Sequence, residues 1–239
     1  MLNEAEVIVG YRTYMDLIQP LIGDKPTIRT GMTQEVTRVE AALDEALAGR
    51  RVALVSSGDP GIYAMAGLAL ELCAARKVKA APAWGQGGGL TIEVVPGIPA
   101  LCAGAALLGA PLTHDFAAIS LSDLLTPWEI IEKRLAAAAQ ADFVIVIYNP
   151  KSKKRDWQLT KAQQIILGHR AGDTPVGIVT GAMRPEQGIV LTTLDQLHTV
   201  VVDMQTTVFI GNGTTRRWGD FIFTPRGYGR KYAIDGRVL

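Results

Sequence analysis

The sequence predicts an α/β fold of two domains in which a largely parallel sheet is covered by helices. Short runs rich in Val and Ile alternate with longer segments of helical periodicity, which is typical of such folds. The runs show little alternation of apolar and polar residues, as expected of strands with both faces buried. A length of 239 residues is generous for one compact domain and sufficient for two small ones. The predicted strands are Val7–Val9, Val52–Val55, Thr91–Val94, Phe143–Ile147, Val176–Val179 and Thr207–Ile210.

The helices between these strands can be recognised by their ends. Thr33 is placed to cap a helix in which Val36, Val39 and Leu43 recur at helical spacing. Thr126 is followed by a proline at the first helical turn, which predicts a second helix start. Two more helices are predicted at Ala100–Gly109 and Asp156–Leu167.

A break between the two domains is predicted where an Ala/Gly/Leu-rich helix ends. The polar stretch 113–115 follows Pro111 there, so we expect one domain over residues 1–112 and another over residues 113–239. Arg76–Gly89 is predicted to be a surface loop with a glycine-rich tip. Because that tip precedes a strand rather than following one, it matches neither a dinucleotide-binding fingerprint nor a P-loop.

The charge balance excludes a surface for polyanions. The chain has 24 Lys plus Arg and 23 Asp plus Glu, a net charge of +1, which provides no basic field for nucleic acid. The basic run Lys151–Arg155 is local, and aromatic residues make up only 6% of the chain, too few for a base-stacking platform. No apolar run approaches the ~18 residues that a membrane helix needs, and no signal peptide opens the chain. We therefore expect a cytoplasmic protein with neither a nucleic-acid nor a membrane partner.

Cys73 and Cys102 are the two cysteines of the chain, and both lie in apolar, helix-like runs. Their surroundings contain no spacing of metal ligands and no disulfide framework. We expect two buried free thiols in a reducing compartment, and no metal site.

The turn after Val52–Val55 has the composition of a ligand site. In open α/β sheets, ligands bind beyond the carboxyl ends of the strands. Gly58 permits close approach of the backbone, and Pro60 fixes the entry into the next helix. Asp59 either caps that helix or accepts hydrogen bonds from a bound group, and the residues alone leave both roles open.

Other predicted strands end in similar turns of small residues. Val95–Ala100 leads into a helix of small residues, which suits either a flat ligand or tight helix–sheet packing. Tyr148–Pro150, Thr180–Met183 and Gly211–Gly213 follow three strands of the second half. Together these turns predict loops from both halves that close around one ligand.

Six segments carry a resemblance to a known family: GDPGIY, VVPGIPA, APLTHDFAAISLSDLLTPW, YNPKSKKR, TGAMRPEQ and IGNGTTR. They resemble the precorrin-3B C(17)-methyltransferases of cobalamin biosynthesis, within the tetrapyrrole methyltransferase superfamily. The resemblance covers nearly the whole chain from Glu4 onward. The GDP turn is typical of the superfamily, whereas HDFAAISLSDLLTPW and YNPKSKKR are typical of the C(17) branch. The family begins with a strand and a Gly-Pro-Gly-type loop, and this chain lacks both before the helix represented by Met1–Glu6.

The resemblance implies a tetrapyrrole methylase-like fold: two αβα domains with S-adenosylmethionine in the cleft between them, usually as a homodimer. It implies methylation of precorrin-3B at C-17 with ring contraction to precorrin-4. Most cofactor contacts would involve backbone groups, which suits the small residues of the turns. The positions that match the family's cofactor contacts are Gly58, Asp59, Pro60, Ile62, Tyr63, Pro99, Ala100, Tyr148, Asn149, Ala182, Gly211 and Asn212.

The chemistry that the resemblance implies makes modest demands on side chains. The sulfonium of the cofactor is already activated, so the protein supplies mainly orientation. Ring contraction calls for proton transfer, for which His114 and Asp115 are the candidates; bracing of the domain junction is the alternative. The substrate carries many carboxylates, and the candidate substrate contacts are Ser122, Asp123, Arg155 and Arg184; a solvated surface is the alternative for the arginines.

Other functions remain open from the sequence. Within the superfamily, the substrate is either metal-free or loaded with cobalt, and another precorrin carbon is an alternative target. A nicotinamide-dependent oxidoreductase would have a similar order of strands, but no G-x-G-x-x-G follows a predicted strand. A non-catalytic tetrapyrrole carrier would bind the macrocycle without using a methyl donor.

Overall fold

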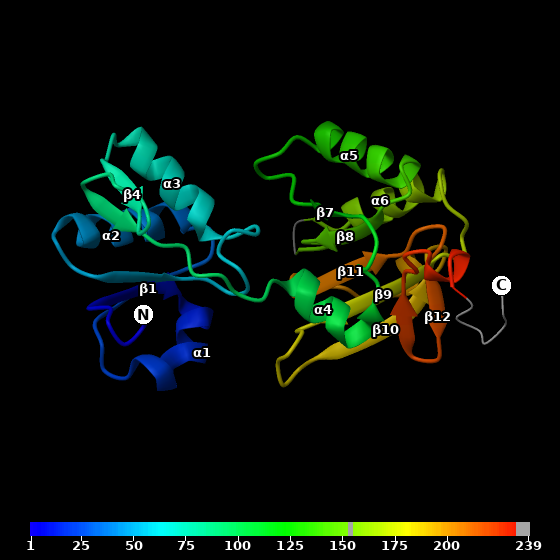
Figure 1. Cartoon of the computed structure of the whole chain (residues 1–239), viewed down its shortest axis with the longest axis horizontal. Coiled ribbons are helices and arrows are strands. Elements are labelled where there is room, and N and C mark those ends of the chain that lie inside the picture. The colour runs from blue at the N-terminus through cyan, green and yellow to red at the C-terminus, as the bar shows by residue number, and fades with distance from the viewer. Residues whose placement is uncertain (153–154, 233–239) are drawn as a thin grey trace. The chain divides into compact units, whose positions relative to one another are not determined.

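The computed structural model describes residues 1–152 and 155–232. The chain forms two compact units, Met1–Pro99 (unit 1) and Ala100–Leu239 (unit 2), whose elements are shown in Figure 1. The division precedes the helix α4 (Ala100–Leu108) rather than following it. The physical reason is that α4 packs on strands of unit 2, as described below.

Unit 1 is built on a parallel three-stranded sheet of order β2-β1-β3. Its strands are β1 (Val7–Tyr11), β2 (Thr27–Thr30) and β3 (Val52–Val55). Its helices are α1 (Arg12–Ile22), α2 (Glu35–Leu47) and α3 (Met65–Ala75). Successive residues of β1 face two apolar clusters: Ile8 packs with Met15 of α1, and Val9 packs in a cluster with Ala42 of α2. This confirms that the apolar run of β1 is buried on both faces.

A second, two-stranded ribbon of unit 1 joins β4 (Ala80–Pro82) to β5 (Leu90–Ile92). The prediction of a loop over Arg76–Gly89 missed β4, which is short and follows a helix closely. The predicted strand Thr91–Val94 is observed only as far as Ile92, and the Val94 side chain beyond it is 47% exposed.

Unit 2 contains a five-stranded sheet of order β10-β9-β11-β8-β7. β8 is parallel to β7, whereas β11 is antiparallel to both β8 and β9, and β10 is antiparallel to β9. A largely parallel sheet is therefore confirmed for unit 1 and is wrong for the centre of unit 2. The strands are β7 (Phe116–Ser120), β8 (Val144–Tyr148), β9 (Pro175–Thr180), β10 (Gly188–Thr193) and β11 (Thr206–Ile210).

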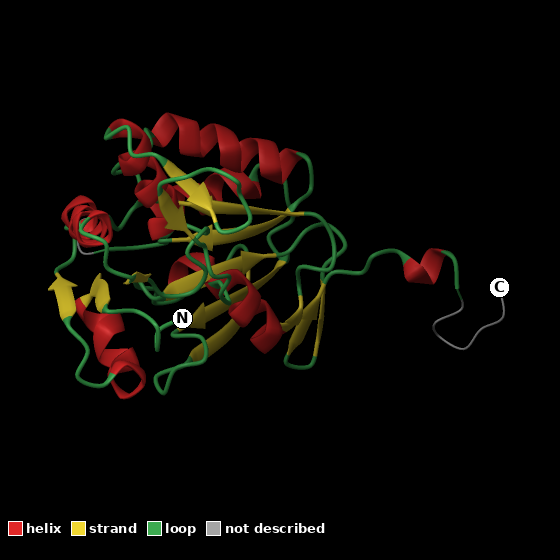
Figure 2. Cartoon of the chain, turned by 60° about the vertical axis from the view of Figure 1, so that its left-hand side comes forward, coloured by secondary structure: helices red, strands yellow, loops and turns green. Residues whose placement is uncertain are grey.

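Helices cover both faces of this sheet. α5 (Trp128–Gln140) and α6 (Gln158–Leu167) contribute Leu135 and Ile166 to a core that includes Ile147 and Val208. On the opposite face, a Cβ built on Gly104 of α4 would lie 2.6 Å from the Phe209 ring. In Figure 2 the helices, in red, lie against the strands, in yellow. Unit 2 is thus an αβα layer arrangement.

The remaining regular elements of unit 2 are short. A hairpin of β12 (Arg216–Trp218) and β13 (Phe221–Phe223) joins β6 (Gly109–Ala110) in a three-stranded sheet. Two 3₁₀ turns follow β10 and β13, at Leu197–Thr199 and Tyr228–Arg230. Within the described residues, no helix combines the length and apolarity needed to cross a membrane.

The predicted helix caps are wrong in detail. α2 begins at Glu35, and Thr33 stands outside it with φ +63°, its hydroxyl donating to the Met32 carbonyl. α5 begins at Trp128 with no side-chain cap, so Thr126 does not cap it. For Thr33 the physical reason is its positive φ, which turns the chain before the helix begins.

The cysteine prediction is correct for one residue and wrong for the other. Cys73 is buried in α3, whereas Cys102 is exposed on α4. Because α4 is apolar around most of its circumference, its sequence does not reveal which side faces the sheet.

Candidate functional site

The turn after β3 is held by its own aspartate. The Asp59 carboxylate accepts the Gly61 N–H at Oδ1 (2.8 Å) and the Gly97 N–H at Oδ2 (2.9 Å). These two backbone donors, Gly97 first, lower the pKa of Asp59 from its ordinary value of 3.8. The Ile62 N–H donates to the Asp59 carbonyl at 3.2 Å. The turn predicted as a cofactor wall is therefore a preformed structure in unit 1.

A second turn of unit 1 lies directly against the first. A Cβ built on Gly97 would overlap the Gly58 carbonyl oxygen, so only glycine permits this approach. Gly58 itself has φ +73°, a conformation that favours glycine. Pro99, the last residue of unit 1, follows this turn and is buried. The two predicted cofactor turns of unit 1 are thus one continuous backbone surface.

In unit 2, the carboxyl end of β8 is tied to the start of α4. The Leu101 N–H donates to the Tyr148 hydroxyl at 2.8 Å, which places Ala100 and Tyr148 at the same edge of the sheet. The Asn149 side chain donates to the Ser120 hydroxyl at 2.9 Å, at the end of the neighbouring β7. The predicted contacts Ala100, Tyr148 and Asn149 are brought together here.

Arg155 is a buried side chain that hydrogen-bonds to the backbone of this turn. Its Nη2 donates to the Asn149 carbonyl at 2.9 Å, and the residue is only 8% exposed. Burial lowers the pKa of the Arg155 guanidinium, and the charge of Asp123 acts in the opposite direction. Its Nε has no hydrogen-bond partner among the described residues. The structure thus gives Arg155 a contact to the turn itself; Lys153 and Lys154 of the same basic run lie outside the described residues.

Replacing Arg155 by methionine is expected to weaken cofactor binding about tenfold, because the Asn149 carbonyl loses a hydrogen bond from a charged donor. Stability should change little, since removal of a buried charge offsets the lost bond. Isothermal titration calorimetry with S-adenosylmethionine measures the first effect and urea unfolding the second. Arg134→Met, on the exposed side of α5, is the matched control; equal affinities of the two variants would contradict the prediction.

The carboxyl end of β9 lies at the same end of the sheet as the Tyr148 turn. Both β8 and β9 pair antiparallel with β11, and Ile147 of β8 and Ile178 of β9 both lie opposite Val208. The Arg184 N–H donates to the Gly181 carbonyl at 2.9 Å and closes a turn around Ala182. Ala182 and Arg184 are therefore placed near the level of the Tyr148 turn.

Ser122 and Asp123 follow β7 at this edge. The Ser122 N–H donates to the Ser120 hydroxyl at 3.2 Å, and Asp123 Oδ2 accepts the Gln158 amide at 2.9 Å. Ser120 and Gln158 position these groups, and neither was predicted from the sequence as a site residue. Ser120 would have been found if the run Phe116–Ser120 had been recognised as a strand.

Three of these turns contain a strained residue. Tyr63, Asn149 and Met183 have φ of +52°, +51° and +60°, a region that side chains other than glycine rarely adopt. Such strain concentrates at ligand sites, where the surrounding structure enforces it. The strained residues lie in the turns after β3 of unit 1 and after β8 and β9 of unit 2.

Gly211 and Asn212 lie at the opposite end of the unit 2 sheet, away from the Tyr148 turn. Because β11 runs antiparallel to β8, with Ile210 opposite Ile145, its carboxyl end lies beside the amino ends of β8 and β9. The Gly211 N–H accordingly donates to the Pro175 carbonyl at 2.9 Å. The prediction that Gly211 and Asn212 share a ligand edge with the carboxyl end of β8 is wrong, because it assumed a parallel strand.

Asn212 has a structural role at this edge. Its Oδ1 accepts the Thr214 and Thr215 N–H groups at 2.9 and 3.1 Å, and its Nδ2 donates to the Asp142 carbonyl at 3.2 Å. Asn212 is 5% exposed, and it borders a cavity of about 430 Å³ that also contacts Arg170. These bonds account for the small-residue loop without a ligand.

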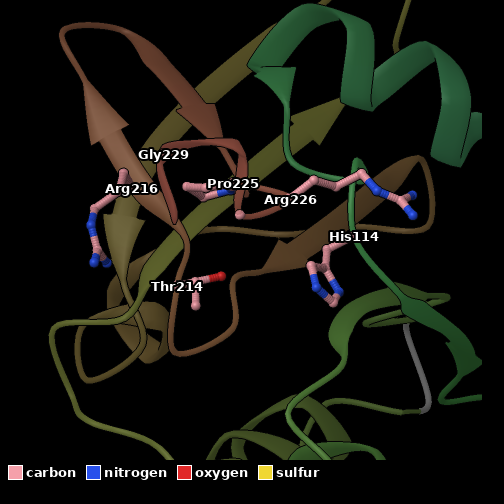
Figure 3. A pocket seen from close by; sticks show the side chains of 7 residues that line it. His114, Thr214, Arg216, Pro225, Arg226 and Gly229 are labelled. Carbon is pink, nitrogen blue, oxygen red and sulfur yellow. The ribbon is translucent and has the colours of Figure 1, made fainter. Parts of the chain in front are cut away.

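The predicted acid–base pair also lies at the opposite edge. Phe116, the first residue of β7, pairs with Val144, the first of β8, and His114 and Asp115 directly precede it. His114 Nδ1 accepts the Asp115 N–H at 2.8 Å. His114 lines a pocket of about 290 Å³ together with Thr214, Arg216, Pro225, Arg226, Gly227 and Gly229. Figure 3 shows this pocket from close by. The structure therefore does not bring His114 and Asp115 to the turns after β8 and β9.

Among the described residues, no group of three or more His, Cys, Asp or Glu side chains is arranged to hold a metal ion. The groups at the carboxyl ends of these strands are backbone amides and carbonyls, a phenol, carboxamides and hydroxyls, and the charged side chains Asp59, Asp123 and Arg155 hydrogen-bond to protein groups. Such groups orient a polar organic ligand and supply little acid–base power.

The family model of the tetrapyrrole (corrin/porphyrin) methylases matches residues 1–198. A "Cobalt-factor III methyltransferase" of Priestia megaterium is 48% identical over 98% of this chain and 42% of its own length. A "Probable cobalt-factor III C(17)-methyltransferase" of Salmonella typhimurium is 47% identical over 95% of this chain and 90% of its own length. A "Precorrin-3B C(17)-methyltransferase" of Sinorhizobium sp is 40% identical over 94% and 87%. The chain thus spans less than half of the first relative and nearly all of the other two.

Solved structures give the same assignment. The crystal structure of the methyltransferase CobJ has a TM-score of 0.85 and 41% identity, covering 94% of this chain and 90% of that one. The cobalt precorrin-4 methyltransferase CbiF has a TM-score of 0.66 at 24% identity over 88% of this chain and 85% of its own, which supports the fold alone. By its sequence and its fold, the chain belongs to the tetrapyrrole (corrin/porphyrin) methylases.

Proposed function

We propose that this protein transfers a methyl group from S-adenosylmethionine to C-17 of a modified tetrapyrrole, with contraction of the macrocycle, in cobalamin biosynthesis. The observation that carries the proposal is 47% identity over 95% of this chain and 90% of a relative named for C(17) methylation. The preformed turns at the carboxyl edges of both units support it, since ligands of α/β sheets bind at such edges.

The residues at these edges fit S-adenosylmethionine. The cofactor is large and polar, and the turns offer backbone groups with few bulky side chains: a Cβ on Gly97 would have no room, and Ala100 and Ala182 are small. The proposed wall of unit 2 is completed by Tyr148 and Asn149. From unit 1, the proposed contacts are Gly58, Pro60, Ile62, Tyr63 and Pro99, on the turns that Asp59 joins.

The cofactor supplies an activated methyl group when it is bound. The task of the chain's own residues is orientation, because correct alignment of the reacting groups lowers a barrier by roughly 7–11 kcal/mol. Tyr148 and Arg155 contribute by fixing the turn at Asn149, each through a hydrogen bond to neighbouring backbone. Ser122, Asp123 and Arg184 follow β7 and β9 and are the proposed substrate contacts.

The substrate is proposed to be precorrin-3B, with a cobalt-containing counterpart as the second candidate. The second candidate is favoured by one observation: the relatives named for cobalt-factor III are 48% and 47% identical, against 40% for the relative named for precorrin-3B. Cobalt would then be part of the substrate and not a cofactor of the protein.

Incubation with methyl-labelled S-adenosylmethionine and either precorrin-3B or cobalt-factor III distinguishes these functions. We expect label in a product one methyl group heavier, and mass spectrometry together with NMR locates it at C-17. Label at another carbon would correct the position. Binding of the tetrapyrrole without transfer would instead identify a carrier and contradict the proposed activity.

We also propose that the protein works as a homodimer. This rests on its resemblance to a family that is usually dimeric. Light scattering coupled to size-exclusion chromatography tests it, and a mass of one chain at micromolar concentration would contradict it.

A further inference from the structure

The Asp59 carboxylate joins two loops that are far apart in the sequence. Oδ1 accepts the Gly61 N–H within its own turn, and Oδ2 accepts the Gly97 N–H from the segment after β5. Each oxygen therefore holds a backbone donor from a different loop. Asp59 does not cap α3, which begins at Met65 with Ala64 before it and no side-chain cap, so both bonds of the carboxylate go to loop backbone.

The second loop has a particular place in the chain. Gly97 lies two positions before Pro99, the last residue of unit 1, so Asp59 holds the segment by which the chain leaves that unit. The backbone of Gly97 also lies against the Gly58 carbonyl. The exit segment is thus fixed by close packing and by a hydrogen bond to an ionised acceptor.

We propose that Asp59 is a positioning residue: its carboxylate locks the Gly58–Gly61 turn and the Gly97 segment into one surface, and it supports cofactor binding through that surface rather than by direct contact. This rests on the proposed function, because S-adenosylmethionine is the ligand to be held. It changes the role of Asp59 from a contact of the cofactor to the link between its contacts.

The charge state of Asp59 suits a permanent link. The two N–H donors, from Gly97 and then Gly61, lower the pKa below 3.8, so the carboxylate is ionised at neutral pH. A group whose pKa is lowered by folding contributes stability above its unfolded pKa and loses it as the pH falls through the folded value. The link should therefore persist at neutral pH and open only in acid, as the pH falls through the lowered pKa of Asp59.

Amide hydrogen exchange followed by NMR tests the link without any ligand. In Asp59→Asn one acceptor oxygen is replaced by an NH₂ group, and we expect the Gly97 or the Gly61 amide to exchange about tenfold faster, since a bond to a charged acceptor is lost. Amides of β1 should keep their protection and show that the unit is folded. Asp24→Asn, an exposed position of unit 1, is the control and should leave both glycines unchanged.

Calorimetry with S-adenosylmethionine then tests the consequence. We expect Asp59→Asn to bind about tenfold more weakly than the wild type and Asp24→Asn to bind equally well. Unchanged exchange at Gly97 and Gly61 would overturn the link, and faster exchange with unchanged affinity would overturn its role in binding. A wild-type protein that binds no S-adenosylmethionine would overturn the proposed function, while the exchange experiment would still decide whether the link exists.

Discussion

Replacing Gly97 by alanine is expected to lower the affinity for S-adenosylmethionine about 100-fold or more. The added Cβ would overlap the Gly58 carbonyl oxygen, which is backbone and cannot rotate away. One of the two loops must therefore shift. A displacement of about 1 Å costs on the order of 100-fold in rate at a catalytic site, and we expect a loss of the same order for a ligand held by this backbone. Isothermal titration calorimetry measures the loss, with circular dichroism to show that the protein is folded.

Gly67→Ala is the matched control for this substitution. Gly67 lies within α3, and a Cβ built on it meets nothing within 4 Å. Binding should be unchanged, and stability should rise by roughly 0.5–1 kcal/mol because alanine is the better helix former. An affinity for Gly97→Ala within threefold of the control would show that the contact between the two loops is not required.

Replacing Phe209 by alanine is expected to destabilise unit 2 by about 3–5 kcal/mol, the range for truncating a buried phenylalanine to alanine. Phe209 is 1% exposed in the central strand β11, and its ring lies where a Cβ on Gly104 of α4 would be. Loss of the ring removes the side chain against which α4 packs on the sheet. Urea unfolding followed by tryptophan fluorescence measures the change.

Phe116→Ala provides the comparison, because Phe116 is 41% exposed on the edge strand β7. We expect it to cost less than about 1.5 kcal/mol, in proportion to the smaller area that it buries. Equal costs for the two substitutions would mean that α4 does not depend on Phe209. A smaller cost for Phe209→Ala would contradict the packing described for unit 2.

The sequence predicted the turns at the carboxyl ends of β3 and β8 well. Gly58 and Asn149 stand at the ends of apolar runs, and the end of a buried strand is visible as the point where apolar residues stop. It also predicted α6 to within two residues of its start at Gln158. These features depend on neighbours along the chain, which a sequence displays directly.

The direction of β11 could not be predicted in the same way. A strand with both faces buried has the same apolar composition whether its neighbours run parallel or antiparallel. Gly211 therefore looked equivalent to Gly58, although the sheet places it at the opposite edge. His114 was misplaced for a related reason, since β7 was not recognised and the residue was assigned to a junction.

The partners of charged side chains were equally hidden. Asp59 meets Gly97, and Arg155 meets Met204 as well as Asn149. Nothing in the spacing of these residues links them, because the contacts form only when distant loops converge. The residue types indicated a polar site, and the contacts showed that both side chains support its backbone.

For this protein, the sequence by itself determined the α/β class, the buried strands, the family and the turns that offer backbone to a ligand. These follow from local periodicity and from motifs that are continuous in the chain. Only the tertiary structure decided which turns share an edge, that Asn212 and Arg155 hold loops in place, and that Asp59 joins two of them. The physical reason is that strand direction and long-range hydrogen bonds are properties of the packed sheet and have no signature in any single segment.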